Sequence, residues 1–341
     1  MKKIKVIVSG GGTGGHYTPA LSFIKYLDKK YDLEVLYFVT KGRIEQKKLK
    51  KDFPKAKMEV VNLTGLKRPL YKLQNIKIIL LALKETFRIK KIIKKFNPDF
   101  GFLTGGYVVG PVGKALSQLK IPFYLHEQNS IMGITNKLLS KKAKKVFTSF
   151  EMSPFIKTGN PVRIPEKEVK RSVLKNYNLD PSKKTLLIMA GSLGSEQIDD
   201  IMYNVYKKNN DINFIHITKN KNKFKEFKNV KTYEYLDNIY EIMSICDGGI
   251  FRGGATTIAE ILFYELKCAI IPWSNASENH QFKNALKLKE MGLAEVFDEK
   301  NIDYNKLQNF IEKIEIKNTD FIWNIKEDES IKNIVKNIDE F

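Results

Sequence analysis

Short runs of apolar residues alternate with amphipathic segments along the whole chain. Continuous apolar runs of this length are typical of strands that are buried on both faces. Segments with helical spacing lie between the runs, so the pattern predicts parallel strands joined by helices in an α/β fold. The predicted strands are residues 4–8, 35–39, 100–104, 123–126, 146–149, 185–190, 214–218, 230–235, 249–251, 269–272 and 294–297.

The two halves of the chain begin in the same way, with an apolar strand that ends in a glycine turn. The turns are residues 10–15 and 191–194. Two such openings predict two doubly wound domains, and ligands of such sheets bind at the carboxyl ends of the strands. We therefore expect both turns to face one interdomain cleft. The expected divisions are an N-terminal domain over 1–160, a C-terminal domain over 161–325, and a charged helix within 326–341 that packs back on the N-terminal domain.

Composition narrows the class of protein. The 341 residues are 43% hydrophobic and 11% aromatic, as in a globular protein with a sizeable core. The net charge of +21 predicts attraction to nucleic acid, an anionic membrane or phosphate-rich substrates, although a lysine-rich proteome gives the same excess. No nucleic-acid motif is recognisable, which disfavours the first partner. Cys246 and Cys268 lie in apolar segments, which predicts buried thiols in a reducing compartment.

No signal peptide opens the sequence, and no apolar stretch reaches the ~20 residues that span a bilayer. We therefore expect a cytoplasmic protein without a membrane-spanning helix.

The first glycine turn contains the G-x-G-x-x-G spacing of dinucleotide sites, at Gly10, Gly12 and Gly15. Such a site needs an acidic residue where the second strand ends, to bind the ribose hydroxyls. Residues 38–42 contain no carboxylate, so NAD binding is disfavoured. A purely structural turn leaves unexplained why His16 directly follows the glycines.

Two further polar segments follow strands in the N-terminal half. Residues 104–111 form a second glycine loop that opens a helix, and helix N-termini attract anions. Residues 126–129 are the polar run His-Glu-Gln-Asn. His126 alone could be a hydrogen-bonded histidine at a strand end, but four consecutive polar residues there favour a binding or catalytic site.

Taken in order, these segments resemble the MurG family of N-acetylglucosaminyl transferases, which make lipid II. The similarity runs from residue 4 to about residue 298. Any one motif is modest support, whereas the ordered set is specific. The matching segments are 11–16 (GGTGGH), 19–21 (PAL), 104–107 (TGGY), 126–129 (HEQN), 159–163 (GNPVR), 191–194 (GSLG), 252–260 (RGGATTIAE), 279–281 (NHQ) and 284–285 (NA).

The resemblance implies a GT-B glycosyltransferase fold, with two Rossmann-like domains around an interdomain cleft. UDP-GlcNAc would bind the C-terminal domain, and lipid I (undecaprenyl-pyrophosphoryl-MurNAc-pentapeptide) would bind the N-terminal domain. Inverting transfer of GlcNAc to the 4-hydroxyl of MurNAc would give lipid II for peptidoglycan synthesis. The enzyme would be peripheral on the cytoplasmic face of the membrane, with cell-wall synthesis and division proteins as partners. The alternative is a GT-B transferase that acts on a different lipid or on a small-molecule acceptor.

The resemblance also implies residue roles. His16 is expected to be the general base, because a neutral imidazole can accept a proton, and Glu127 is the alternative. His16 could instead only hydrogen-bond the acceptor. The expected acceptor contacts are Gly12, Gly14, His16, Tyr17, Gly105, Gly106, Tyr107 and Asn129.

For the donor, Glu260 is expected to bind the ribose, Tyr235 and Leu236 the uracil, and Gln281 with Asn284 the sugar. Arg163, Ser192 and backbone N–H groups would neutralise the pyrophosphate. No Asp-x-Asp pair occurs, so neither a metal clamp of that type nor a cofactor is expected. The full expected donor set is Thr13, Gly14, Gly15, Asn129, Arg163, Ser192, Leu193, Gly194, Tyr235, Leu236, Ala255, Thr256, Thr257, Ile258, Ala259, Glu260, Gln281 and Asn284.

One segment combines basic and apolar residues. Residues 67–95 contain ten Lys or Arg and one acid, Glu85. An apolar stripe on a helix generally faces the core. Basic residues flank this stripe, however, which predicts a helix lying in an anionic membrane interface. The stripe is Ile76, Ile79, Leu80, Leu83 and Phe87.

Overall fold

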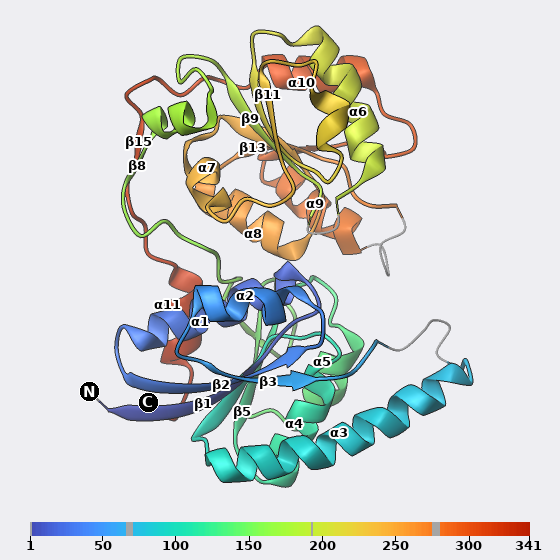
Figure 1. Cartoon of the computed structure of the whole chain (residues 1–341), viewed down its shortest axis with the longest axis vertical. Coiled ribbons are helices and arrows are strands. Elements are labelled where there is room, and N and C mark those ends of the chain that lie inside the picture. The colour runs from blue at the N-terminus through green and yellow to red at the C-terminus, as the bar shows by residue number, and fades with distance from the viewer. Residues whose placement is uncertain (1, 66–70, 192–193, 275–279) are drawn as a thin grey trace. The chain divides into compact units, whose positions relative to one another are not determined.

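The structure, a computed structural model, describes residues 2–65, 71–191, 194–274 and 280–341 (Figure 1). The chain divides into two compact units. Unit 1 comprises Met1–Val162 and Asp328–Phe341, and unit 2 comprises Arg163–Glu327.

Unit 1 is built on a seven-stranded sheet in which every pair of neighbouring strands is parallel. The strand order is β3-β2-β1-β4-β5-β6-β7, which is the Rossmann order with one added edge strand. The carboxyl ends of β1 and β4 are neighbours, because Ser9 pairs with Leu103. The glycine loops that follow these two strands are therefore brought together. The strands are β1 (Lys3–Ser9), β2 (Asp32–Thr40), β3 (Lys57–Val61), β4 (Phe100–Leu103), β5 (Phe123–Glu127), β6 (Lys145–Thr148) and β7 (Ile156–Lys157).

Helices cover both faces of this sheet. One core cluster contains apolar side chains of α1, α2 and α11, and a second cluster contains those of α3, α4 and α5. The helices are α1 (Gly14–Asp28), α2 (Ile44–Asp52), α3 (Gln74–Phe96), α4 (Val109–Gln118), α5 (Ile134–Leu139) and α11 (Glu329–Lys336).

Helix α11 packs on unit 1 although the whole of unit 2 precedes it in the sequence. Its N-cap Asp328 accepts hydrogen bonds from the backbone N–H groups of Ser330 and Val162, at 2.9 and 3.0 Å. Burial raises the pKa of Asp328. The apolar side chains Ile331 and Ile334 join the core of unit 1. One carboxylate thus caps the helix and ties together the two places where the chain enters and leaves unit 1.

Unit 2 repeats the plan with six parallel strands in the order β11-β10-β9-β12-β13-β14. A two-stranded antiparallel sheet, β8 with β15, joins the first and last segments of the unit. The strands are β8 (Val169–Lys170), β9 (Thr185–Met189), β10 (Asn213–Ile217), β11 (Val230–Tyr233), β12 (Gly248–Phe251), β13 (Lys267–Ile270), β14 (Ala294–Val296) and β15 (Ile322–Trp323). The helices are α6 (Glu196–Lys208), α7 (Ile239–Ile245), α8 (Ala255–Tyr264), α9 (His280–Glu290) and α10 (Tyr304–Glu312), with 3₁₀ turns η1 (Arg171–Tyr177) and η2 (Lys221–Phe224).

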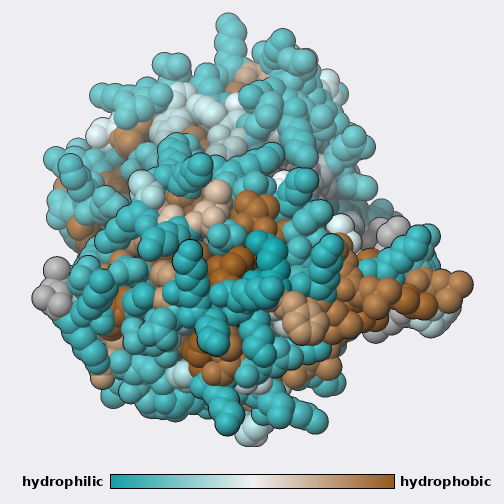
Figure 2. All heavy atoms as spheres, turned by 60° about the horizontal axis from the view of Figure 1, so that its bottom comes forward, coloured by the Kyte–Doolittle hydropathy of each residue, from teal (hydrophilic) through white to brown (hydrophobic). Residues whose placement is uncertain are grey.

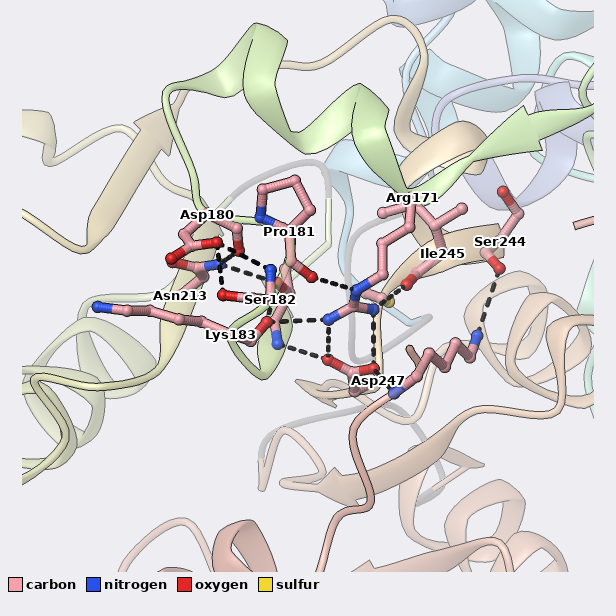
Figure 3. A network of polar contacts seen from close by, with 12 residues as sticks. Arg171, Asp180, Pro181, Ser182, Lys183, Asn213, Ser244, Ile245 and Asp247 are labelled. Carbon is pink, nitrogen blue, oxygen red and sulfur yellow. Dashed lines mark hydrogen bonds and ion pairs between the residues drawn. The ribbon is translucent and has the colours of Figure 1, made fainter. Parts of the chain in front are cut away.

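A fully buried ion pair holds the amino ends of β9 and β12 in unit 2 (Figure 3). The Arg171 guanidinium donates to both carboxylate oxygens of Asp247, at 2.9 and 2.8 Å, and to three backbone carbonyls. Asp247 also accepts from the backbone N–H groups of Thr185 and Lys317, at 2.6 and 2.7 Å. Buried charges are tolerated when their hydrogen-bonding capacity is filled in this way. The network fixes η1 and the segment before β15 to the sheet.

All the strands predicted from apolar runs are present, with ends shifted by three residues at most. Four of the strands in the described part of the chain were not predicted. Strand β3, with the sequence KMEVV, mixes polar and apolar residues at the edge of its sheet, and β7, β8 and β15 are only two residues long. Cys246 and Cys268 are free and buried as predicted, and burial raises the pKa of the Cys246 thiol to about 12. Within the described ranges no helix has the length and apolar content to cross a membrane.

Candidate active site

The loop between β1 and α1 is packed so closely at Gly10 and Gly11 that neither position has room for a side chain. A Cβ atom on Gly10 would lie 1.7 Å from Thr104 Oγ1, and Gly12 has a φ of +90°. Thr13, the N-cap of α1, is exposed and makes no side-chain capping bond, while Gly14 and Gly15 are partly exposed. The loop therefore presents backbone around His16.

A buried carboxylate that sequence reasoning missed supports this loop. Both oxygens of Glu45 accept from the Gly12 N–H, at 3.1 and 3.0 Å, and one also accepts from Thr40 N–H at 3.0 Å. Glu45 is fully buried, and its carboxylate fills the space where a Gly11 side chain would lie. In a dinucleotide-binding loop, backbone N–H groups of this kind point at the pyrophosphate. Here the Gly12 N–H already donates to the Glu45 carboxylate, which is a second reason against NAD binding.

His16 has a defined orientation. Its Nδ1 lies 3.0 Å from the Thr104 carbonyl oxygen and 2.7 Å from Gln128 Oε1. A carbonyl oxygen can only accept, so Nδ1 carries the hydrogen and, in the neutral ring, Nε2 keeps its lone pair. The side chain is partly exposed. The geometry suits proton abstraction by Nε2.

The second glycine loop packs against the first. Gly105 and Gly106 have φ of +106° and +88°, and a Cβ on Gly106 would lie 2.3 Å from the Gly11 carbonyl oxygen. The Tyr107 hydroxyl accepts from Arg43 Nε at 3.1 Å. The structure therefore brings together the predicted acceptor residues of both loops.

Glu127 is committed to holding its own loop. Its carboxylate is 1% exposed and accepts from the backbone N–H groups of Asn129 and Gly133, at 3.0 and 2.9 Å. The side-chain amides of Asn129 and Asn136 donate to it at 3.1 and 2.9 Å. These donors occupy both carboxylate oxygens of Glu127, and this geometry favours His16 over Glu127 as the base.

The expectation that Tyr17 contacts the acceptor needs correction. The ring is 4% exposed in the core of unit 1, and its hydroxyl donates to Asp52 at 2.8 Å. Tyr17 follows His16 directly, and consecutive helical residues point about 100° apart. The side chain therefore lies in the core.

In unit 2, the glycine turn after β9 lies partly outside the described residues, which include neither Ser192 nor Leu193. Gly191 and Gly194 have φ of +85° and +73°. Ser195 then caps α6 and accepts from Ile198 N–H at 3.4 Å. The turn leads directly into the positive end of this helix.

Arg252 connects the Ser195 cap to a second loop, a contact that sequence reasoning did not find. Its guanidinium donates to Ser195 Oγ at 2.6 Å, to the Ile271 carbonyl oxygen at 3.0 Å, and to Glu299. Glu299 also accepts from the backbone and hydroxyl of Ser274, at 3.0 and 2.9 Å. Burial acts to raise the pKa of Glu299. The hydrogen bonds from Ser274 and Arg252 together lower it by more, so the net pKa lies below its ordinary value. Arg252 thus organises the carboxyl ends of several strands.

Two of the predicted donor residues, Arg163 and Glu260, contact each other directly. Arg163 donates through Nε and a terminal nitrogen to Glu260 Oε1, at 3.2 and 3.0 Å. Burial is the largest single influence on Arg163 and lowers its pKa, but the charge and hydrogen bond of Glu260, together with Tyr235 and Tyr264, leave the pKa raised. Tyr264 fixes the same segment by donating to the Arg163 carbonyl oxygen at 2.6 Å. The expected fixed charge of Arg163 is thus paired with Glu260 in this structure.

Glu260 lies on α8, whose N-terminal end is a second candidate anion site. Its N-cap is Gly254, which has no side chain to occupy the first N–H groups of the helix. Among the predicted donor residues here, Ala255 and Ile258 are buried, whereas Thr256, Thr257 and Ala259 are partly exposed.

Gln281 and Asn284 support the glycine turn that precedes α8. Asn284 is fully buried and donates to the Gly253 carbonyl oxygen at 3.1 Å. Gln281 accepts from Trp273 N–H at 3.0 Å. A Cβ on Gly253 would lie 2.2 Å from the Gln281 carbonyl oxygen, so only glycine fits. The bonds to Gly253 and Trp273 use Asn284 Nδ2 and Gln281 Oε1, whereas Asn284 Oδ1 is buried without a hydrogen-bond partner.

The residues expected beside the uracil follow β11. Tyr235 is 45% exposed and Leu236 is partly exposed, so both are accessible within unit 2. Within the ranges that the structure describes, no three His, Cys, Asp or Glu side chains are arranged to hold a metal ion.

The apolar stripe of α3 is exposed. The same helix buries Ile89 and Ile93, so its fully buried apolar side chains lie in the C-terminal half. In Figure 2, hydrophobic residues gather over the part of α3 that extends from unit 1. We call the stripe the α3 surface. Its exposed fractions are 54% for Ile76, 51% for Ile79, 60% for Leu80, 37% for Leu83 and 67% for Phe87.

Known proteins of similar sequence share both halves of this architecture. Residues 6–148 match the glycosyltransferase family 28 N-terminal domain, and residues 185–340 match the glycosyltransferase family 28 C-terminal domain. A relative from Thermosipho melanesiensis is 41% identical over 92% of this chain and 91% of its own length. A relative from Thermotoga maritima is 37% identical over 91% and 92%. Both are named UDP-N-acetylglucosamine–N-acetylmuramyl-(pentapeptide) pyrophosphoryl-undecaprenol N-acetylglucosamine transferase.

Solved structures show the same fold. A crystal structure of Acinetobacter baumannii MurG has a TM-score of 0.68 at 23% identity, over 92% of this chain and 90% of that one. The UDP-GlcNAc 2-epimerase of Methanocaldococcus jannaschii has a TM-score of 0.63 at 15% identity, over 98% of both chains. The fold is therefore the predicted α/β architecture of two Rossmann-like units found in GT-B enzymes. Because both domain families match in order along the chain, the protein belongs to glycosyltransferase family 28.

Proposed function

We propose that the protein transfers GlcNAc from UDP-GlcNAc to the 4-hydroxyl of MurNAc in lipid I, and so forms lipid II. The observation that carries this proposal is the 41% identity to a transferase of that name over nine-tenths of both chains. Unit 1 takes the acceptor and unit 2 takes the donor in this proposal. The assignment is supported by His16 in the glycine loops of unit 1 and by two helix N-termini at the strand ends of unit 2.

In the proposed reaction, His16 Nε2 takes the proton of the acceptor hydroxyl. The hydroxyl oxygen then bonds to C1 of GlcNAc from the face opposite UDP. The bond from C1 to the phosphate oxygen breaks, and its electron pair leaves with UDP. Attack from the opposite face inverts C1, so an α-linked donor gives a β-linked product.

The departing diphosphate needs positive potential. Backbone N–H groups at the N-terminal ends of α6 and α8 supply it in this proposal, together with the turn at residues 191–194. Ser192 belongs to the proposed contacts, although it lies outside the described residues. Glu260 offers the ribose hydroxyls a carboxylate that Arg163 holds in a fixed direction.

The protein is further proposed to work on an anionic membrane surface, at the cytoplasmic face. The support is the α3 surface, whose five apolar side chains are all exposed, among ten basic residues within 67–95. Basic residues near an anionic surface contribute roughly 1 kcal/mol each, and apolar side chains add to this by burial. Such docking would bring unit 1 to the lipid that carries the acceptor.

The reaction is tested by incubating the protein with radiolabelled UDP-GlcNAc and lipid I, followed by lipid extraction. We expect label in the lipid fraction and one UDP released for each sugar transferred. Transfer to another lipid or to a soluble sugar, with none to lipid I, would replace the proposed acceptor. Absence of UDP release with every acceptor would overturn the proposal.

A further inference from the structure

A continuous chain of hydrogen bonds connects His16 to two side chains that have no assigned role. His16 Nδ1 lies 2.7 Å from Gln128 Oε1, and Gln128 Nε2 lies 2.9 Å from His126 Nδ1. His126 Nε2 in turn lies 2.9 Å from the Gly159 carbonyl oxygen. All four residues belong to unit 1.

Backbone carbonyls fix the direction of every bond in this chain, because a carbonyl oxygen only accepts. Gly159 requires the hydrogen of His126 on Nε2, which leaves the His126 Nδ1 lone pair free to accept. The Gln128 amide must then turn its NH₂ toward His126, and the same NH₂ donates to the His126 carbonyl oxygen at 2.9 Å. Gln128 Oε1 therefore faces His16 and can only accept from it.

The far end of the chain agrees with this direction. The Thr104 carbonyl oxygen lies 3.0 Å from His16 Nδ1, so it independently requires a hydrogen on that nitrogen. Gly105 makes the approach possible, since a Cβ there would lie 2.9 Å from the His16 ring. Three separate carbonyls, at Gly159, His126 and Thr104, thus select the same tautomer of His16.

The direction of these hydrogen bonds is also fixed at neutral pH. His126 is fully buried, Gln128 is 1% exposed, and burial lowers the pKa of His126 to about 4. His126 therefore stays neutral and keeps a single hydrogen, on Nε2. A neutral amide beside His16 also matters, because a carboxylate in that place would favour the protonated ring and remove the base.

We propose that Gln128 and His126 are positioning residues, which hold His16 as the Nδ1–H tautomer and keep Nε2 as the proton acceptor. The last step rests on the proposed function of His16 as general base. When Nε2 takes the hydroxyl proton, the imidazolium keeps its Nδ1 hydrogen on Gln128 Oε1 and Thr104. No proton passes to Gln128, so the chain orients and stabilises without relaying charge.

The tautomer can be read without activity. In the full-length protein labelled with ¹⁵N-histidine, long-range ¹H–¹⁵N spectra distinguish a protonated nitrogen from an unprotonated one. Among the four histidines, the signals of His16 and His126 are identified by their loss in His16→Ala and His126→Asn. We expect His16 to carry its hydrogen on Nδ1 and His126 on Nε2. A His16 ring with its hydrogen on Nε2, or an equal mixture, would overturn the inference even if the enzyme transfers GlcNAc normally.

A second test measures enzyme activity in Gln128→Glu, which preserves the shape of the side chain and adds a negative charge. An adjacent carboxylate favours imidazolium by roughly 1–3 pH units, so the acid limb of the kcat profile should move upward by that amount. KM for UDP-GlcNAc should stay unchanged. An unshifted profile in this variant contradicts the proposal, whereas loss of UDP-GlcNAc binding alone would point to a structural role and also contradict it.

A matched pair at His126 covers the case in which Gln128→Glu does not fold. In His126→Asn the side-chain oxygen can replace Nδ1 as the acceptor for Gln128, whereas His126→Leu offers no acceptor. We expect His126→Asn to keep kcat within about threefold of wild type and His126→Leu to lose about tenfold or more. Equal kcat in the two variants would overturn the positioning role. Failure of the wild-type protein to transfer any sugar would instead count against the proposed function, and the spectra would still report the tautomer.

Discussion

Both oxygens of the Glu45 carboxylate accept a hydrogen bond from the Gly12 N–H, at 3.1 and 3.0 Å, and so join the start of α2 to the glycine loop that precedes His16. Because Glu45 is fully buried, Glu45→Ala leaves two backbone N–H groups without their acceptor. We expect this change to lower the free energy of unfolding by about 1–3 kcal/mol and to reduce kcat. Urea unfolding and lipid I turnover measure the two effects. Partly exposed Glu34→Gln, which removes a charge far from the loop in sequence, is the control. A wild-type kcat in Glu45→Ala would remove Glu45 from the support of the site.

His16→Ala should reduce kcat by about 100-fold or more, because the general base is lost. UDP affinity should remain near that of wild type, since His16 belongs to unit 1. Steady-state kinetics and calorimetry with UDP test both parts. Glu127→Gln is the informative companion: it should mainly lower stability, because the four donors around the carboxylate lose their charged acceptor. If His16→Ala retains full kcat while Glu127→Gln abolishes it, the roles are reversed.

The Arg163–Glu260 contact predicts that donor binding and stability are linked in unit 2. Glu260→Ala removes the proposed ribose acceptor and leaves the partly buried Arg163 guanidinium without this partner. We expect UDP-GlcNAc binding to weaken by about 1.5–3 kcal/mol, together with a fall in stability. Calorimetry measures the first quantity and thermal unfolding the second. Exposed Glu265→Gln provides the control, and unchanged affinity in Glu260→Ala would exclude the ribose role.

Burial of neutral His126 predicts a pH dependence of stability. Its folded-state pKa of about 4 lies below the ordinary value of 6.5, so the unfolded chain binds the proton more tightly. The stabilisation is complete above pH 6.5 and is lost as pH falls toward 4, by about 3 kcal/mol in total. His216 acts in the same direction, because burial lowers its pKa as well. Urea unfolding between pH 7.5 and 4.5 should show a shallower loss in His126→Asn, and an unchanged slope would contradict a buried neutral His126.

The architecture could be predicted from the sequence because each central strand is a continuous apolar run and each domain opens with a glycine turn. The alternation of strands and helices then predicts parallel, doubly wound sheets, whereas the order of the strands comes from the structure. His16 and the loop at residues 104–107 could be found in the same way, since local sequence determines a glycine turn.

The supporting contacts could not be predicted from the sequence. Glu45 reaches Gly12 across 33 positions, and Arg252 reaches Glu299 across 47, so neither pair has a local signal. Tyr17 was expected at the acceptor site because it follows His16, but it lies in the core. Proximity in the sequence does not determine which face of α1 a side chain occupies. From its helical spacing alone, the α3 stripe could have faced the core. Only the tertiary structure shows that the core lies against the other end of that helix.

The α3 surface yields the prediction that separates membrane docking from packing. Leu80 and Leu83 are exposed, so replacing both with Ser should leave the free energy of unfolding nearly unchanged. The same change should weaken binding to phosphatidylglycerol vesicles, and high salt should weaken it further by screening the basic residues. Sedimentation with vesicles measures the binding, with phosphatidylcholine vesicles as the uncharged comparison.

Ile89→Ser, on the buried side of the same helix, is the matched control and should lower stability instead. Activity on a short-chain, water-soluble analogue of lipid I should survive in the double variant, because the proposed chemistry lies in the glycine loops. Wild-type vesicle binding in the double variant would show that α3 does not dock on the membrane.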